Sequence, residues 1–261
     1  MNIIVCIKQV PDTGQVKIDT ETGHLIREGV PSIVNPEDKN AIEEAVLLKE
    51  KYGGSITAIT MGPMQAKDAL VEALAMGADE AILLSDAAFR GADTWATSYT
   101  LSLAIKKIGG FDMILCGREA LDGNTAQVGP QLAEFLDLPS IVYAQKIIVQ
   151  DDTVTAEAAT EDGYQVVETK LPVLVTATKD LNIPRIPALV DTMEALDKEI
   201  SLWRAEDLGA EETKVGIKGS FTRIRKTTTP DFSKASVKIL DGDLNGICDQ
   251  AVAVLKENYL L

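Results

Sequence analysis

Short apolar runs alternate with longer amphipathic stretches through the first half of the chain. The runs "NIIVCIKQ", "SITAIT", "EAILLS" and "DMILCG" start at residues 2, 55, 80 and 112 and are rich in β-branched and other apolar side chains. Short, continuously apolar runs of this kind predict buried strands. Because stretches with helical spacing lie between them, we predict an α/β fold with an open, mostly parallel sheet and helices on both faces.

Three stretches between these runs predict amphipathic helices, at residues 35–54, 63–79 and 93–110. In the first, Asn35 suits the N-cap, Pro36 suits the first helical position, and a pair of glycines ends the helix. The other two follow a similar scheme. On their apolar faces we expect the first two helices to carry Ala41, Ala45, Leu48, Tyr52, Ala66, Leu70, Ala73 and Leu74.

The pattern changes after about residue 140. Residues 140–178 are mostly strand-like, with turn residues at Asp151-Asp152 and Asp162-Gly163. This predicts antiparallel strands that extend one edge of the sheet. A short helix is expected at residues 191–199.

An extended arm and a helix are predicted at the C-terminal end. Residues 209–234 lack any sustained period, and residues 244–260 have a helical pattern. Because an arm of this length has little to pack on in a compact monomer, we expect it to lie on a partner. We therefore predict two regions, a nucleotide-binding α/β domain at residues 1–204 and an arm with its helix at residues 205–261.

Composition and charge narrow the classes of partner. The 261 residues carry a formal net charge of −15, which argues against nucleic acid and an anionic membrane surface as partners. No apolar stretch approaches the roughly 20 residues of a membrane span, so we expect no membrane insertion and a cytoplasmic location. The three cysteines lack metal-ligand spacing, and the one histidine, His24, reads as an exposed loop residue. We predict reduced thiols, no metal site and no catalytic side chain.

Three of the predicted strands end in loops that suit a ligand. In open parallel sheets, ligands bind outside the carboxyl ends of the strands, near the point where the strand order reverses. After the first strand, residues 6–8 lead into a long excursion that closes at "NPED", and after the second, residues 61–63 turn into a helix. After the fourth, residues 116–118 lead into "DGNTAQVGP", residues 122–130.

The stretch "DGNTAQVGP" starts as a turn and ends as the first turn of a helix. The pair Asp122-Gly123 suits a tight turn, with the glycine free to take a positive φ, and Asn124 or Thr125 suits the helix cap. The next three amides would then be free to bind a phosphate, and Gly129 would allow its close approach. An ordinary helix cap fits the same residues. The ligand-binding alternative assigns the phosphates to the amides of Ala126, Gln127 and Val128, and a ribose hydroxyl to Asp122.

Two common nucleotide motifs, G-x-G-x-x-G and G-x-x-x-x-G-K-[ST], are missing from the sequence. Taken alone, the residues therefore indicate an α/β protein with a candidate adenine-nucleotide site and do not name the ligand.

Several motifs, in one order, carry a resemblance to a known family. They are "VCIKQVPD", "NPED" with "AIEEAVLLKEK", "MGP" followed by "ALAMGAD", "CGREALDGNTAQVGP", "LPVLVTATKDLNIPRIP" and "GSFTRIRKTTTP". Over nearly its whole length the chain resembles the β subunit of electron-transfer flavoproteins. The resemblance implies the adenine-nucleotide-binding α/β fold and a heterodimer with an α subunit. It also implies that the C-terminal arm supports a mobile flavin-carrying domain.

This family divides by the ligand that the β subunit holds. One branch holds AMP as a structural element, and the electron-bifurcating branch holds a second FAD that takes a hydride from NADH. "DGNTAQVGP" and "GSFTRIRKTTTP" are similar to the bifurcating branch, which implies FAD. Carried over by position, the implied nucleotide contacts are Cys6, Asn35, Pro36, Glu37, Asp38, Met61, Gly117, Arg118, Asp122, Gly123, Asn124, Thr125, Ala126, Gln127, Val128 and Gly129.

The segment "KDLNIPRIP" is similar to the loop through which this family docks dehydrogenase partners. The resemblance implies that Leu181 is the exposed apolar anchor of this loop. Without the resemblance, Leu181 reads as an ordinary packing leucine after a strand. The implied recognition residues are Leu181, Asn182, Ile183, Pro184 and Arg185.

The implied function is electron transfer, in which the flavin and not a side chain carries the redox chemistry. NADH would reduce the FAD; one electron would pass to the second flavin of the heterodimer and on to an acyl-CoA dehydrogenase-type partner, and the other to ferredoxin. Two alternatives stay open. One is a conventional, non-bifurcating electron-transfer flavoprotein β subunit that holds AMP, and the other is a stand-alone adenine-nucleotide-binding protein, against which the arm and the "LNIPRIP" segment argue.

Overall fold

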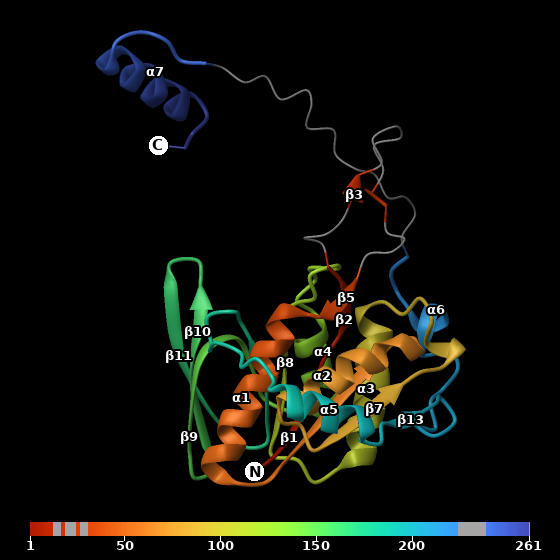
Figure 1. Cartoon of the computed structure of the whole chain (residues 1–261). Coiled ribbons are helices and arrows are strands. Elements are labelled where there is room, and N and C mark those ends of the chain that lie inside the picture. The colour runs from red at the N-terminus through yellow and green to blue at the C-terminus, as the bar shows by residue number, and fades with distance from the viewer. Residues whose placement is uncertain (13–16, 19–24, 27–30, 224–238, 261) are drawn as a thin grey trace. The chain divides into compact units, whose positions relative to one another are not determined.

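The computed structural model describes residues 1–12, 17–18, 25–26, 31–223 and 239–260. The chain forms two compact units, residues 1–223 and residues 224–261, and each is described by itself (Figure 1). The histidine at position 24 and residues 224–234 of the predicted arm lie outside the described residues.

A nine-stranded sheet forms the centre of the first unit. Its order is β11-β10-β9-β12-β8-β1-β6-β7-β13. Neighbours from β9 to β13 in this order are parallel, and β9, β10 and β11 form an antiparallel edge. The predicted α/β fold with antiparallel edge strands is therefore confirmed. The strands are β1 (Asn2–Cys6), β6 (Ser55–Met61), β7 (Glu80–Leu84), β8 (Met113–Gly117), β9 (Ser140–Gln150), β10 (Thr153–Thr160), β11 (Gly163–Lys170), β12 (Val173–Ala177) and β13 (Ser201–Trp203).

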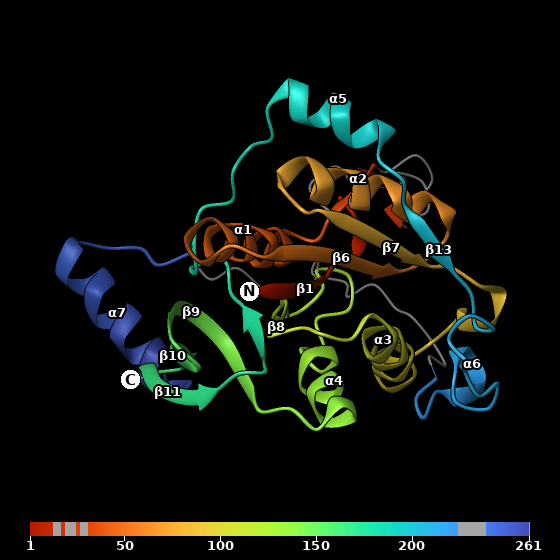
Figure 2. The same cartoon turned by 90° about the horizontal axis from the view of Figure 1, so that it is seen from below.

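Helices cover both faces of the sheet, as continuously apolar strands require. In Figure 2, α1, α2 and α5 lie on one face, and α3 and α4 lie on the other. Two small antiparallel pairs, β2 with β5 and β3 with β4, lie in the excursion between β1 and α1. The bounds of these elements are α1 (Pro36–Tyr52), α2 (Lys67–Met76), α3 (Thr94–Ile108), α4 (Val128–Leu136), α5 (Leu189–Asp197), β2 (Gln9–Pro11), β3 (Lys17–Ile18), β4 (Leu25–Ile26) and β5 (Ser32–Val34), with short 3-10 turns at Met64–Ala66 and Ala87–Phe89.

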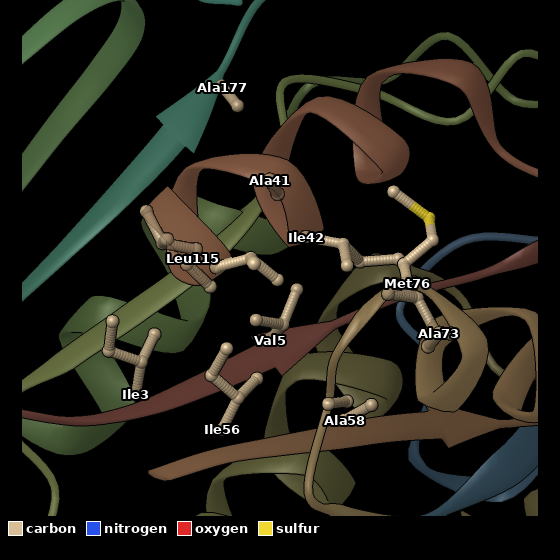
Figure 3. Packing of buried hydrophobic residues seen from close by; sticks show 14 of the residues in the cluster. Ile3, Val5, Ala41, Ile42, Ile56, Ala58, Ala73, Met76, Leu115 and Ala177 are labelled. Carbon is tan, nitrogen blue, oxygen red and sulfur yellow. The ribbon is translucent and has the colours of Figure 1, made fainter. Parts of the chain in front are cut away.

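The core consists of two apolar clusters, one on each face. Figure 3 shows the first, in which Ile3 and Val5 of β1 and Ile56 of β6 pack against Ile42 of α1 and Met76 of α2. The second lies between the sheet and the helices α3 and α4. Successive side chains along a strand belong alternately to the first and the second cluster. This alternation is expected for a strand that is buried on both faces, because successive side chains point to opposite faces of the sheet.

Three local outcomes differ from the sequence-based expectation. β12 lies inside the parallel part of the sheet, between β8 and β9, and not among the antiparallel edge strands. β13, which the apolar pattern did not single out, pairs with β7 at the other edge. Tyr52 does not join the buried face of α1: its ring is partly exposed, and its hydroxyl donates to the carbonyl of Val149.

The first unit continues past residue 204, where the sequence analysis placed the start of the arm. Residues 216–219 form the short helix α6 (Gly216–Gly219), and Val215 before it is buried in the second cluster. The amide of Ile217 donates to the carbonyl of Arg90 at 3.0 Å. These contacts attach residues 205–219 to the sheet domain.

The described part of the second unit contains the predicted C-terminal helix, α7 (Leu244–Glu257). Asp243 caps this helix, because its Oδ1 accepts a hydrogen bond from the amide of Gly246. The side chains of Leu244, Val252 and Leu255 are exposed. Among the helices of the described residues, none is long and apolar enough to cross a bilayer.

Candidate functional site

The strand order reverses between β1 and β8. From β1 the chain continues to β6 and β7 on one side, and it then returns to place β8 on the other side of β1. The carboxyl ends of two neighbouring parallel strands therefore meet where a ligand is expected. The loops after Cys6 and Gly117 lie at this point.

Asp38 of α1 joins these two strand ends. Its Oδ2 accepts a hydrogen bond from the amide of Lys8 at 2.7 Å, and its Oδ1 accepts one from the amide of Gly117 at 2.9 Å. A buried carboxyl group thus fixes the first turn of α1 to the ends of β1 and β8, where the strand order reverses. Two of the residues predicted to contact the nucleotide, Asp38 and Gly117, are therefore hydrogen-bonded to each other at these strand ends.

Burial shifts the titration of this carboxyl group. Burial raises the pKa of Asp38 from 3.8 to about 7, while hydrogen bonds from the side chain of Asn35 and from the two amides act in the opposite direction. Because the pKa of Asp38 is higher in the folded chain than in the unfolded chain, protonation of this carboxyl group stabilises the folded chain. Its contribution to stability is therefore present below about pH 4 and is lost as the pH rises through about 7.

We expect the free energy of unfolding of the wild type to fall relative to that of Asp38→Asn between pH 4 and 7. The slope should approach about 1.4 kcal/mol per pH unit, because one proton is released from this site on unfolding. Urea unfolding of both chains over this pH range measures the difference. Parallel stability curves would show that Asp38 titrates normally in the folded chain.

Asn35 and Glu37 hold the loop that follows β8. Asn35 is the N-cap of α1, as predicted, but its side chain makes no capping bond. Its Oδ1 accepts from the amide of Leu121, and its Nδ2 donates to the carbonyl of Glu119. The Oε2 of Glu37 accepts from the amide of Glu119, and its Oε1 lies 3.3 Å from a guanidinium nitrogen of Arg118. The "NPED" and "CGRE" motifs are therefore in direct contact.

The helix after this loop begins later than predicted. Its N-cap is Gln127 and its first residue is Val128, so neither Asn124 nor Thr125 is the cap. The positive φ angles fall on Asn124 (45°) and Ala126 (51°), not on Gly123. The amides of Gly123 and Asn124 both donate to the carbonyl of Ala120, which forms the expected tight turn one step earlier.

The backbone amides of residues 125–129 are the free donors of this loop. No acceptor for them is recorded in the described part of the chain. Two of the three predicted phosphate donors, Ala126 and Gln127, belong to the irregular turn before the helix, and Val128 belongs to its first turn. The loop thus offers unpaired amides and a helix N-terminus in one place, which suits a phosphate.

Gly129 has a different role from the one predicted. A Cβ at this position would lie 2.5 Å from the Cγ2 of Thr176 and 3.2 Å from the Sγ of Cys116. The missing side chain therefore lets α4 approach strands β8 and β12, and it does not make room for a ligand. Pro130 lies in the first turn of α4. Backbone N–H groups in the first turn of a helix have no partner within the helix, so the missing N–H of proline costs no hydrogen bond here.

An ion pair that the sequence did not suggest spans the site. The Nζ of Lys8 lies 2.7 Å and 2.9 Å from the two carboxylate oxygens of Asp122. The two residues are 114 positions apart, and no local pattern links them. In this state the carboxylate predicted to bind a ribose hydroxyl is paired with a lysine that follows β1.

The remaining predicted contacts are less directly involved. The thiol of Cys6 is buried beside that of Cys116, and burial together with the charge of Asp38 raises the pKa of Cys6 to about 12. Both thiols therefore stay protonated and act as small core side chains. Met61 ends β6 at the same edge and is half-buried, while Pro36 is exposed at the start of α1.

A hollow of about 470 Å³ lies elsewhere, between the end of α2 and the start of α5, and it includes Lys49, Asp79 and Arg185. None of the residues around the unpaired amides lines it. The candidate site is therefore defined by the hydrogen-bond donors at the strand ends.

Comparison with known proteins identifies the family. A family model described as "Electron transfer flavoprotein domain" matches residues 22–208, more than two thirds of the chain. The chain belongs to the electron transfer flavoprotein family.

Similar family members match the chain from end to end. The electron transfer flavoprotein subunit beta of Clostridium acetobutylicum is 51% identical, and the alignment covers 100% of both chains. The caffeyl-CoA reductase-Etf complex subunit CarD of Acetobacterium woodii is 45% identical over 100% of both chains. Protein FixA of Azotobacter vinelandii is 40% identical over 98% of this chain and 94% of its own. The chain is thus similar, over nearly its whole length, to electron transfer flavoprotein beta subunits.

In this flavoprotein chain, the segment that contains the predicted recognition residues is fixed to α1 by polar contacts. Asn182 donates to the carbonyl of Asn40 at 3.0 Å and to the Oε2 of Glu44 at 3.1 Å. Arg185 contacts both carboxylate oxygens of Glu43, at 2.8 Å and 3.0 Å. Asn182 and Arg185 therefore hold the segment in place.

The expectation for Leu181 is wrong in one respect. Leu181 is half-buried and packs against the first apolar cluster, so it is not the exposed anchor. Its packing role is the one that its position after a strand suggests. The exposed apolar side chains are Ile183 (91%) and Ile186 (93%), and Leu189 and Met193 of α5 continue this surface.

Proposed function

We propose that the β1–β8 edge of this electron transfer flavoprotein beta subunit holds FAD and accepts electrons from NADH. The loop at residues 120–129 carries the proposal, because its unpaired amides stand at a strand reversal and beside a helix N-terminus. When bound, FAD would supply hydride acceptance from NADH and the release of electrons one at a time. With NADH as donor, we place this reaction in the cytoplasm.

The residues of the edge would bind and orient the nucleotide. The amides of residues 125–129 are free to receive the phosphates, and Lys8 and Arg118 add positive charge to a chain that is otherwise strongly acidic. Release of Asp122 from Lys8 would make its carboxylate available to a ribose hydroxyl. Asp38 and Asn35 would keep the two loops at a fixed separation.

FAD is preferred to AMP because of the loop sequence and one of the relatives. "DGNTAQVGP" resembles the bifurcating branch, and the relative from Acetobacterium woodii carries the name of a caffeyl-CoA reductase-Etf complex. We extend this to an acyl-CoA dehydrogenase-type partner, and to ferredoxin as the low-potential acceptor. The conventional alternative, AMP held as a structural element, would use the same amides.

We also propose where the partners bind. The exposed side chains of Ile183 and Ile186, with the outer face of α5, would receive the dehydrogenase. Residues from 205 onward, with α7 and its exposed apolar residues, would contact the α subunit and the flavin domain that it carries.

The flavin content of the complex tests the proposed function. We expect the chain, co-expressed and purified with its α subunit, to contain two FAD per heterodimer and to lose flavin absorbance rapidly when NADH is added. One FAD with one AMP per heterodimer would leave the conventional alternative. A complex without flavin would leave only an adenine-nucleotide-binding role.

A further inference from the structure

Tyr143 of β9 has a backbone conformation that is rare for an aromatic residue. Its φ is 60°, in the left-handed region, and it stands where β9 shifts register against β12; β9 also shifts register against β10, two residues further along. Bulges beside functional sites often redirect one side chain. A bulky residue with positive φ is costly and persists only where its surroundings enforce it.

Neighbouring strands enforce this conformation. The amide of Tyr143 donates to the Oγ1 of Thr176 at 2.9 Å, and the next residue, Ala144, accepts from both the amide and the hydroxyl of Thr178. Thr176 is buried, and its methyl group lies against Gly129. The position of Tyr143 is therefore tied to the start of α4 and to the loop with the unpaired amides.

The tyrosine ring itself is accessible, although its backbone is fixed. The residue is 36% exposed, and the guanidinium carbon of Arg118 lies 5.9 Å from the ring centroid. Arg118 is oriented by Glu37 and Glu119, yet its Nε is buried without a hydrogen-bond partner in the described part of the chain. A flat ring and an unpaired donor thus stand side by side at the carboxyl ends of β8 and β12.

We propose that Tyr143 and Arg118 form a subsite for the second ring system of a dinucleotide. This subsite rests on the proposed function and adds Tyr143 as a binding residue that the sequence did not suggest. The chemistry suits a flat heteroaromatic ring with carbonyl acceptors, such as the isoalloxazine of FAD: the phenol ring provides a face to stack on, and the guanidinium provides a donor. AMP has only one ring system and, with its phosphate on the free amides, leaves this subsite empty.

Nucleotide titrations of the complete complex test the subsite. The full chain, purified with its α subunit and freed of the nucleotide on the beta subunit, is titrated with FAD and with AMP. We expect Tyr143→Ala to raise the Kd for FAD roughly five- to 150-fold, the effect of removing one stacked aromatic side chain. The Kd for AMP should change less than about twofold.

Two further variants separate stacking from support of the fold. Tyr143→Phe keeps the ring and should keep the FAD affinity. Because phenylalanine does not quench flavin emission by electron donation, this variant should give brighter bound flavin than the wild type. Tyr164→Ala removes an exposed tyrosine of β11 that lies outside the site, and should change neither affinity.

The outcomes distinguish this subsite from the proposed function. Equal losses of FAD and AMP affinity in Tyr143→Ala would overturn the subsite and leave Tyr143 as a structural residue. Unchanged FAD affinity in that variant would overturn it as well, with FAD binding by the wild type still intact. A wild-type complex that binds neither nucleotide at this site contradicts the proposed function and the subsite together.

Discussion

Gly117→Ala is expected to lower the free energy of unfolding by about 3 kcal/mol and to abolish binding at the proposed nucleotide site. A Cβ at this position would lie 2.3 Å from the Oδ1 of Asp38 and 2.9 Å from its backbone nitrogen. Backbone and a buried carboxyl group cannot move aside as a flexible side chain could, so the first turn of α1 must shift. The contacts of Asp38 with both strand ends would be lost together with the positions of the two loops.

Gly123→Ala in the same loop is the matched control. Among the residues that the structure describes, no heavy atom lies within 4 Å of a Cβ at position 123, and Gly123 does not have a positive φ. We expect its stability to equal that of the wild type. Urea unfolding measures both variants, and equal stability of the two would refute the packing argument at Gly117.

Arg185→Ala is also expected to lower the free energy of unfolding, by about 2 to 4 kcal/mol. Glu43 has a side chain only 6% exposed, and Arg185 supplies the charge that balances it. Removal of the guanidinium leaves a buried carboxylate without its ion-pair partner. The segment before α5 should detach from α1, and binding of the dehydrogenase should weaken with it.

Two variants calibrate this result. Glu43→Gln removes the buried charge and keeps hydrogen-bonding groups, so its loss of stability should be clearly smaller than that of Arg185→Ala. Lys170→Ala breaks an exposed ion pair with Asp152 and should leave stability unchanged, as such surface pairs contribute little. Chemical unfolding measures the loss of stability in each of the three variants. Hydrogen exchange of residues 179–188 shows whether the segment detaches from α1. An effect of Arg185→Ala no larger than that of Lys170→Ala would contradict the argument.

Most elements of the sheet domain could be predicted from the sequence, because local periodicity reports burial. The runs that contain Val5, Ile59 and Leu115 are apolar on both faces, and each proved to be a central strand. Strand neighbours could not be predicted in the same way. β12 follows directly on the antiparallel strands in the chain, and only contacts with β8, far away in the sequence, decide that β12 is parallel.

That the loops of the candidate site meet at one edge could be predicted, but the contacts of several of its residues could not. The signals at the strand ends and in the turn before α4 are local, and the structure brings these loops together at the β1–β8 edge. The pair Lys8–Asp122 and the contact of Gly129 with Thr176 join distant segments, and no spacing rule reveals them. The exposure of Leu181 was mispredicted because a motif identifies a segment and does not show which of its side chains turns outward.

Helix α1 makes two sets of contacts from one rigid element. Its first turn holds the strand ends through Asp38, and its next turns hold the segment at residues 181–185 through Asn40 and Glu43. Each helical residue advances the chain by about 100° of rotation and 1.5 Å. Inserting or deleting a single residue between Asp38 and Asn40 would therefore rotate the residues on one side of the change by about 100° relative to the other. One of the two sets of contacts would be lost, even if all the residues that make them were retained. The number of residues between the two contacts is as strict a requirement as their chemical identity.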